Sequence, residues 1–217
     1  MTHFESPEAL PRLLDSLAIE KGEVIYVCSD LAKIPLPQIS SDLSPYAIRA
    51  REDRWCEFVF QSLIEKIGPS GTLLVPTFSY KCSSPSIAFS PKETPSEVGP
   101  FSNWLRRHPN AIRSLHPIFS VTGVGKDASL ILNDCGKAAF GPSSPFGRLE
   151  EFRGRFVSLG VALHHSLTYA HHLEQLAGCG HRINKNFFTA VKTDGKVPDG
   201  PFWAFVRNPE VPHSVDL

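Results

Sequence analysis

The sequence lacks an excess of charge of either sign, because 22 lysine and arginine residues balance 22 aspartate and glutamate residues. A strong basic excess is typical of domains that bind nucleic acid, so the composition argues against that class of protein. The longest apolar runs are about five residues, far short of the roughly 20 that a membrane-spanning helix needs. The first residues also lack the basic and apolar segments of a signal peptide. We therefore expect a soluble, cytoplasmic protein that binds neither nucleic acid nor a membrane.

Several chemical signatures are missing as well. The five cysteines are odd in number and contain no CxxC pair, which argues against a disulfide framework and a cysteine-based zinc site. The HExxH spacing of zinc hydrolases, the Walker lysine loop and the GxSxG nucleophile elbow are absent too. We therefore expect reduced thiols and no bound metal.

Helical and strand-like segments alternate along the 217 residues, a length that suits one α/β domain. The predicted helices cover residues 6–22, 49–68, 101–108, 127–134 and 166–178. The predicted strands cover residues 23–31, 71–80, 118–125 and 154–163, and two more β segments join at a turn around Asp194 and Gly195. The sequence thus predicts a single domain over residues 1–217 with a sheet covered by helices. Ligands in such folds gather at strand ends, where Ser29, Asp30 and Thr77 are placed.

A histidine in the stretch RSLHPIFS, His116, is the first candidate for chemistry. Histidine is the side chain best suited to general-base work near neutral pH, although a structural histidine in a loop would give the same pattern. The stretch HHSLTYAHHLE supplies a second candidate group. His171 and Glu174 are three residues apart and share a helix face, whereas the adjacent His172 must face elsewhere.

The stretch FGPSSPFGRL, residues 140–149, predicts a tight loop that could offer backbone N–H groups to a ligand oxygen. An ordinary turn would have the same composition. A serine hydrolase that combines Ser29 or Ser120 with His116 and Glu174 also fits the spacing, and it is the alternative from a different class of enzyme.

Four stretches together resemble the aminoglycoside 3-N-acetyltransferase family, the antibiotic N-acetyltransferases. They are GTLLVPTFSY, TPSEVGPFSNWLRRHPNAIRSLHPIFSVTGVG, AFGPSSPFGRLEEFRGRFVSLGVAL and TYAHHLEQLAG, within a resemblance that runs from about residue 8 to about residue 207. The resemblance implies an α/β/α sandwich with a central mixed sheet, distinct from the GNAT fold. It also implies transfer of an acetyl group from acetyl-CoA to an amine carried by a sugar, in a monomer or homodimer.

The resemblance assigns roles to particular residues. The family's SLHP histidine falls on His116, and its T-x-x-H-x-x-E element falls on Thr168, His171 and Glu174. We expect His116 to take the proton of the ammonium group while Glu174 orients it, with His171 close by. The expected contacts to acetyl-CoA come from hydroxyl residues: Ser29, Thr77, Ser120, Ser143 and Ser144. The expected contacts to the acceptor come from Asp30 and Thr168.

Two departures from the family pattern concern the acceptor. Cys28 and Asp30 stand where the family often has histidine and serine, and the chain ends short of the usual family length, which implies a shortened C-terminus. An aminoglycoside antibiotic is the first acceptor that the resemblance implies. An amino sugar of surface polysaccharide biosynthesis is the alternative, and the balanced charge favours such a less cationic amine.

Overall fold

The computed structural model describes residues 8–34, 44–195, 197 and 200–211. A five-stranded sheet in the order β3-β4-β2-β1-β5 forms its centre. The strands are β1 (Val24–Ser29), β2 (Thr72–Pro76), β3 (Ile112–Arg113), β4 (Val121–Gly125) and β5 (Arg155–Leu159). β1 pairs in parallel with β2 and β5, whereas β4 pairs antiparallel with β2 and β3, so the sheet is mixed as predicted.

Alternate residues of the central strands enter two separate cores. Ile25 and Val27 of β1 belong to one apolar cluster, whereas Val24 and Tyr26 belong to the other. The first cluster contains residues of α1 (Ala9–Ser16), α2 (Pro45–Ile67) and α3 (Pro100–Leu105). The second contains residues of α4 (Ala128–Leu132) and α5 (Pro145–Glu151). Helices therefore cover both faces of the sheet, which is the predicted α/β/α sandwich.

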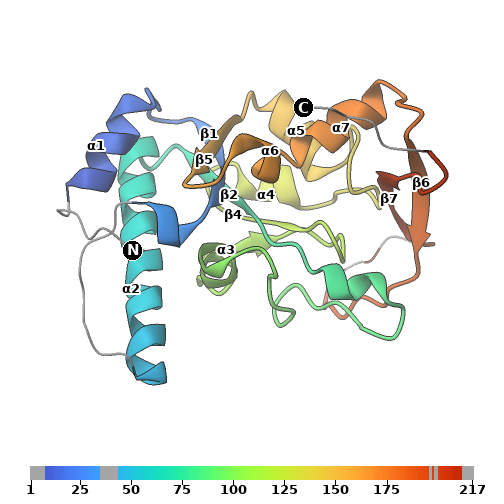
Figure 1. The fold of residues 1–217 in the computed structure, drawn as a ribbon, viewed down its shortest axis with the longest axis horizontal. Helices are drawn as coiled ribbons and strands as arrows, with labels where there is room; N and C mark the ends of the chain where they lie inside the picture. The colour runs from blue at the N-terminus through green and yellow to red at the C-terminus, as the bar shows by residue number, and fades with distance from the viewer. Residues whose placement is uncertain (1–7, 35–43, 196, 198–199, 212–217) are drawn as a thin grey trace.

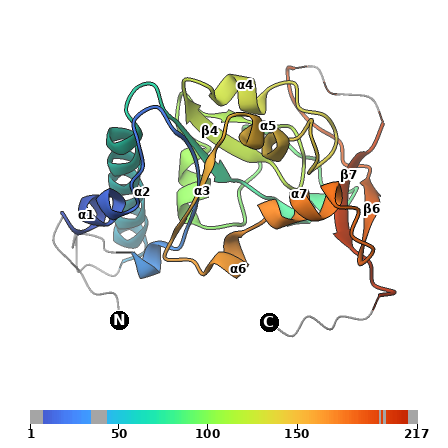
Figure 2. The ribbon, with the colours of Figure 1, turned by 90° about the horizontal axis from the view of Figure 1, so that it is seen from above.

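The C-terminal part of the chain adds elements beyond the sheet. Two short helices follow β5, namely α6 (Leu163–Ser166) and α7 (Tyr169–Leu176). α7 lies within the helix predicted over residues 166–178, whereas α6 lies almost entirely before it and was not predicted. An antiparallel pair then follows, β6 (Arg182–Phe187) with β7 (Phe202–Arg207). Figure 1 shows α1 and α2 at one end of the molecule and the β6–β7 pair at the other, and α7 lies beside that pair in Figures 1 and 2.

Two predicted segments differ from the structure. The predicted turn residues Asp194 and Gly195 lie between the paired strands β6 and β7, but the connection is longer than a turn, because β6 ends at Phe187 and β7 begins only at Phe202. β6 exposes most of its side chains, so its sequence carries no apolar alternation from which a strand could be predicted. The second half of the predicted tight loop is helix α5, which begins with Ser144 as its cap and Pro145 in its first turn.

No helix in the described ranges is long and apolar enough to cross a bilayer.

Candidate active site

The carboxyl ends of the parallel strands β1 and β5 lie side by side, with Ser29 opposite Leu159. The chain leaves β5 there and forms α6 and α7. α6 contacts the end of β1, because the Cys28 thiol lies 3.5 Å from the Ser166 carbonyl oxygen and donates to it. Burial raises the pKa of the Cys28 thiol to about 12, so it stays neutral at physiological pH. This contact fixes the end of α6, just before α7, against the end of β1.

The two neighbouring histidines of α7 face different surroundings, as the sequence predicted. His172 is buried, and its Nδ1 accepts a hydrogen bond from the Gly141 N–H at 3.0 Å. Its Nε2 lies 3.2 Å from a carboxylate oxygen of Glu150, so the two contacts fix α7 to α5 and to the loop before it. His171 is half-buried and presents its ring edge-on to Phe140, with ring centroids 5.7 Å apart.

His171 and Glu174 form the hydrogen-bonded pair that their spacing predicts. His171 Nδ1 lies 2.8 Å from Glu174 Oε2, so the neutral imidazole that donates from Nδ1 keeps its lone pair on Nε2. The other carboxylate oxygen, Glu174 Oε1, lies 3.1 Å from His181 Nε2. Arg182 Nε lies 2.7 Å from Glu174 Oε2 in an ion pair.

The surroundings of Glu174 keep its carboxylate ionised. Partial burial alone would raise its pKa, but hydrogen bonds from His171 and His181 and the positive charge of Arg182 outweigh that effect and lower the pKa overall. The ionised carboxylate of Glu174 therefore lies next to the imidazole of His171, and its charge stabilises the imidazolium formed when His171 accepts a proton.

His116 lies in different surroundings and does not contact Glu174. Its ring is buried between Phe119 and Phe202. Its Nδ1 accepts hydrogen bonds from the N–H groups of Ile118 and Phe119, and its Nε2 lies 3.2 Å from the Trp203 carbonyl oxygen. Burial lowers its pKa to about 4, against the ordinary 6.5. The predicted bond between Glu174 and His116 is therefore wrong, because both imidazole nitrogens bind backbone groups and the carboxylate binds His171 instead.

Three of the hydroxyl groups predicted to contact acetyl-CoA are completely buried and bonded inside the protein. Thr77 donates to or accepts from Thr122 at 2.9 Å and lies 3.1 Å from the Ser120 carbonyl oxygen. Ser120 donates to the Thr77 carbonyl oxygen at 2.8 Å and accepts a bond from Arg113. Ser144 caps α5. The Ser120 hydroxyl is thus unavailable to a serine nucleophile mechanism, and the pairing with His116 that the hydrolase alternative needs is not formed.

The remaining predicted residues lie nearer the surface. Ser29 is half-buried at the end of β1, and Ser143 is exposed before α5. Asp30 caps the short 3₁₀ helix η1 (Leu31–Lys33) by accepting from the Ala32 N–H, and it forms an ion pair with Lys33. Thr168 is the half-buried N-cap residue of α7, three residues before His171.

Sequence reasoning missed His181 and Arg182. Both contact Glu174, His181 from just before β6 and Arg182 from its first position. They lie seven and eight positions after Glu174, beyond the end of α7 at Leu176, so the spacing of a helix does not connect them. Among the described residues, no group of three or more histidine, cysteine, aspartate and glutamate side chains is placed to hold a metal ion.

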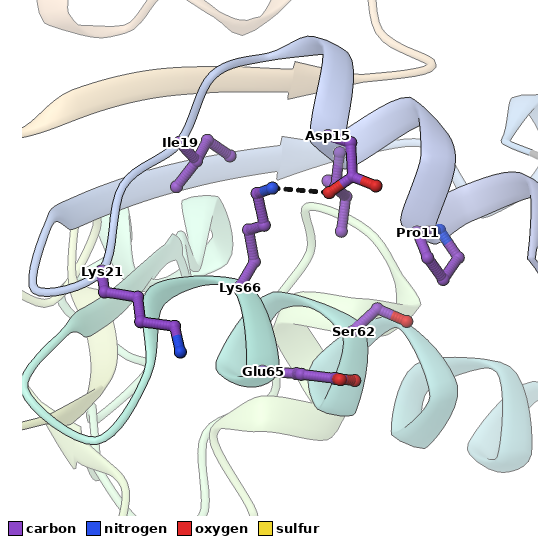
Figure 3. Close-up of a pocket in the computed structure, with 8 residues that line it drawn as sticks. Pro11, Asp15, Ile19, Lys21, Ser62, Glu65 and Lys66 are labelled. Atoms are coloured by element: carbon purple, nitrogen blue, oxygen red, sulfur yellow. Dashed lines mark hydrogen bonds and ion pairs between the residues drawn. The ribbon is translucent and has the colours of Figure 1, made fainter.

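A separate hollow of about 390 Å³ lies between α1 and α2. Figure 3 shows that Lys66 of α2 points across it toward Asp15 of α1, and the two side chains form an ion pair at 2.6 Å. The hollow lies at the end of the molecule opposite α7 (Figure 1), so it is separate from the cluster around Glu174.

The protein is thus an α/β/α sandwich whose mixed sheet is followed by a helix that carries a histidine–carboxylate pair. Residues 48–214 match the family described as aminoglycoside 3-N-acetyltransferase, and the chain belongs to this family. The aminoglycoside N(3)-acetyltransferase IV of Salmonella sp is 30% identical over 180 residues, which cover 82% of this chain and 66% of the relative. The enzyme VII of Streptomyces paromomycinus is 36% identical over 93 residues, 42% of this chain and 32% of that protein. The matched part of the chain thus spans less than two thirds of the length of each of these relatives.

Solved structures share the fold. AAC-IIIb in a binary complex with CoASH has a TM-score of 0.73 at 21% identity, with 99% of this chain and 80% of that chain covered. A mutant of AAC(3)-IVa in complex with a gentamicin has a TM-score of 0.72 at 23% identity, with 96% of this chain and 72% of that chain covered. At these identities the likeness establishes the fold, which is the one that the sequence predicted.

Proposed function

We propose that the protein transfers an acetyl group from acetyl-CoA to an amine of an aminoglycoside, with His171 as the general base and Glu174 as its partner. The observation that carries the proposal is the 2.8 Å contact between His171 Nδ1 and Glu174 Oε2 on a half-buried helix face. Membership of the aminoglycoside 3-N-acetyltransferase family supports the reaction class. The relatives bound to CoASH and to gentamicin support the two substrates.

The chemistry requires a base because an alkyl amine is mostly protonated at neutral pH and an ammonium group cannot attack a thioester. Nε2 of His171 accepts the proton, and the ionised Glu174 stabilises the resulting imidazolium through Nδ1–H. The freed amine attacks the thioester carbonyl carbon and forms the tetrahedral intermediate. As this intermediate collapses, the C–S bond breaks, the amide nitrogen loses its remaining extra proton to water, and the departing CoA thiolate takes the proton held by His171. Ser29, half-buried at the end of β1, is the proposed donor to the oxyanion, since Thr77 is bonded inside the core.

The experiment measures thiol release from acetyl-CoA with gentamicin, sisomicin or a nucleotide-linked amino sugar as the acceptor. We expect release that depends on an aminoglycoside. Glu174→Gln keeps the size of the side chain but removes its charge, and it should lower kcat by roughly a hundredfold, the usual scale for general-base catalysis.

His164→Ala is the matched control, because His164 is an exposed histidine on the neighbouring helix α6 and should leave turnover unchanged. Thiol release that does not depend on any amine would indicate hydrolysis instead. A Glu174→Gln variant as active as the parent protein would remove the pair from the mechanism, and preference for the nucleotide-linked amino sugar would reassign the acceptor.

A further inference from the structure

The guanidinium group of Arg182 binds both members of the proposed catalytic pair. Its Nε lies 2.7 Å from Glu174 Oε2, and its Nη2 lies 3.4 Å from His171 Nε2. Its Nη1 donates to the Phe205 carbonyl oxygen of β7 at 3.3 Å. The side chain is only 16% exposed, so these three contacts define its position.

The contact of Arg182 with His171 Nε2 is incompatible with Nε2 accepting a proton from a substrate. A neutral imidazole that donates from Nδ1 has one lone pair, on Nε2, and Arg182 is a donor that does not lose its proton in proteins. While Nη2 covers that lone pair, no ammonium group can donate to it. A second positive charge at this point would also meet repulsion from the guanidinium.

We propose that Arg182 occupies the place of the acceptor's ammonium group in the free enzyme, and that the acceptor binds by displacing Nη2 from His171. Arg182 is on this view a positioning residue that sets the affinity for the acceptor. The inference rests on the proposed function, because it takes His171 as the base. The balance of charge supports it, since Arg182 and Glu174 cancel in the free enzyme and leave no net attraction for a cation.

The geometry allows this displacement without loss of the pair. The bond from Nη2 to Nε2 is the longest of the three contacts, whereas the ion pair with Glu174 is short. His181 holds the other oxygen of Glu174 independently at 3.1 Å. One arm of the guanidinium can therefore leave His171 while the carboxylate keeps its orientation.

The experiment compares Arg182→Gln with the full-length parent in steady-state kinetics with gentamicin. Removal of the positive charge leaves Glu174 uncompensated and uncovers Nε2, so the KM for gentamicin should fall by roughly two- to fivefold, the upper range for a partly exposed ion pair. The KM for acetyl-CoA should stay the same. A merely structural role for Arg182 would not improve the affinity for one substrate.

Arg155→Gln is the matched control. Arg155 also joins a carboxylate and a backbone carbonyl, with Nη2 2.6 Å from Glu23 and Nη1 3.3 Å from the Leu17 carbonyl oxygen, but it lies on β5 away from Glu174. This control should leave both KM values unchanged. An Arg182→Gln variant whose KM for gentamicin is unchanged or higher, beside an active parent, would overturn this inference alone.

A crystal structure of the parent protein with gentamicin provides a second test that does not depend on the folding of a variant. We expect an amine nitrogen of gentamicin within hydrogen-bond distance of His171 Nε2, with Arg182 Nη2 displaced. Arg182 still bonded to Nε2 in that complex would refute the proposal. A parent protein that neither binds nor acetylates any aminoglycoside would overturn the proposed function and this inference with it.

Discussion

Replacement of His116 by asparagine should change how the stability of the protein depends on pH. The imidazole is buried and neutral, with a pKa lowered to about 4 from the ordinary 6.5. The unfolded chain therefore binds more protons than the folded protein between these two values. Stability from this group is fully present above about pH 6.5 and is lost as the pH falls toward 4, by about 3 kcal/mol in total.

Asparagine at position 116 keeps the hydrogen bonds that the His116 Nδ1 makes with the backbone but has no group that titrates between pH 4 and 7. Its side-chain oxygen can accept from the N–H groups two and three residues ahead, as Nδ1 of His116 does from Ile118 and Phe119. It leaves the Trp203 carbonyl oxygen without the donor at Nε2 and a small cavity beside Phe202, a cost of about 2 kcal/mol at pH 7. The variant should thus be less stable than the parent at pH 7 and as stable or more stable near pH 4.

The assay is urea unfolding followed by tryptophan fluorescence at pH 7, 5.5 and 4.2, with the free energy of unfolding extrapolated to water for both proteins. Other titrating groups are common to the two, so the difference between their curves isolates His116. If the free energy of unfolding falls by the same amount between pH 7 and pH 4.2 in the variant and the parent, His116 is not held neutral in the folded protein. Since we assign the base to His171, the folded variant should also keep acetyl transfer within a few-fold of the parent.

Two further predictions concern the start of α5. Ser144→Ala removes a buried hydroxyl that accepts from the Gly147 N–H and donates to the Gly141 carbonyl oxygen. We expect the free energy of unfolding in urea to fall by about 1–2 kcal/mol, and an unchanged midpoint would contradict the capping role. Gly147→Ala should lower the stability of the folded protein by about 2–3 kcal/mol, although alanine is the better helix former. The reason is that its Cβ would lie 2.5 Å from the Gly141 and Pro142 carbonyl oxygens. A variant with a higher melting temperature than the parent would refute this clash.

The predicted architecture came from patterns that reflect burial directly. β1 and β2 are buried strands rich in Val, Ile and Leu, and their ends were visible in the sequence as Ser29 and Thr77. The position of β6 was not predicted, because four of its six residues are exposed and its sequence shows no alternation of apolar and polar residues. Its pairing with β7 rests on backbone hydrogen bonds, which any sequence can form. Its first residue, Arg182, was therefore missed as well.

The candidate site was predictable where its members share a helix and not where they meet across the fold. Three residues of spacing place His171 and Glu174 on one face of α7, and the structure joins them. Nothing in the spacing of His116 shows whether its nitrogens meet a carboxylate or the backbone, because that depends on how the chain folds back at Trp203, 87 residues later. A histidine before a proline has the same sequence signature in either case.

The pairing of β1 with β5 has a consequence for biosynthesis. Ile25 pairs with Arg155 and Ser29 with Leu159, so one edge of β1 gains its neighbour only after most of the chain has been made. Until then, a nascent chain presents an apolar strand with free N–H and C=O groups, which is the kind of surface on which chains associate. Long-range parallel pairing also slows folding. The yield of folded protein in a recombinant host should therefore rise at a lower growth temperature and when chaperones that shield the ribosome-bound N-terminal half are present in excess.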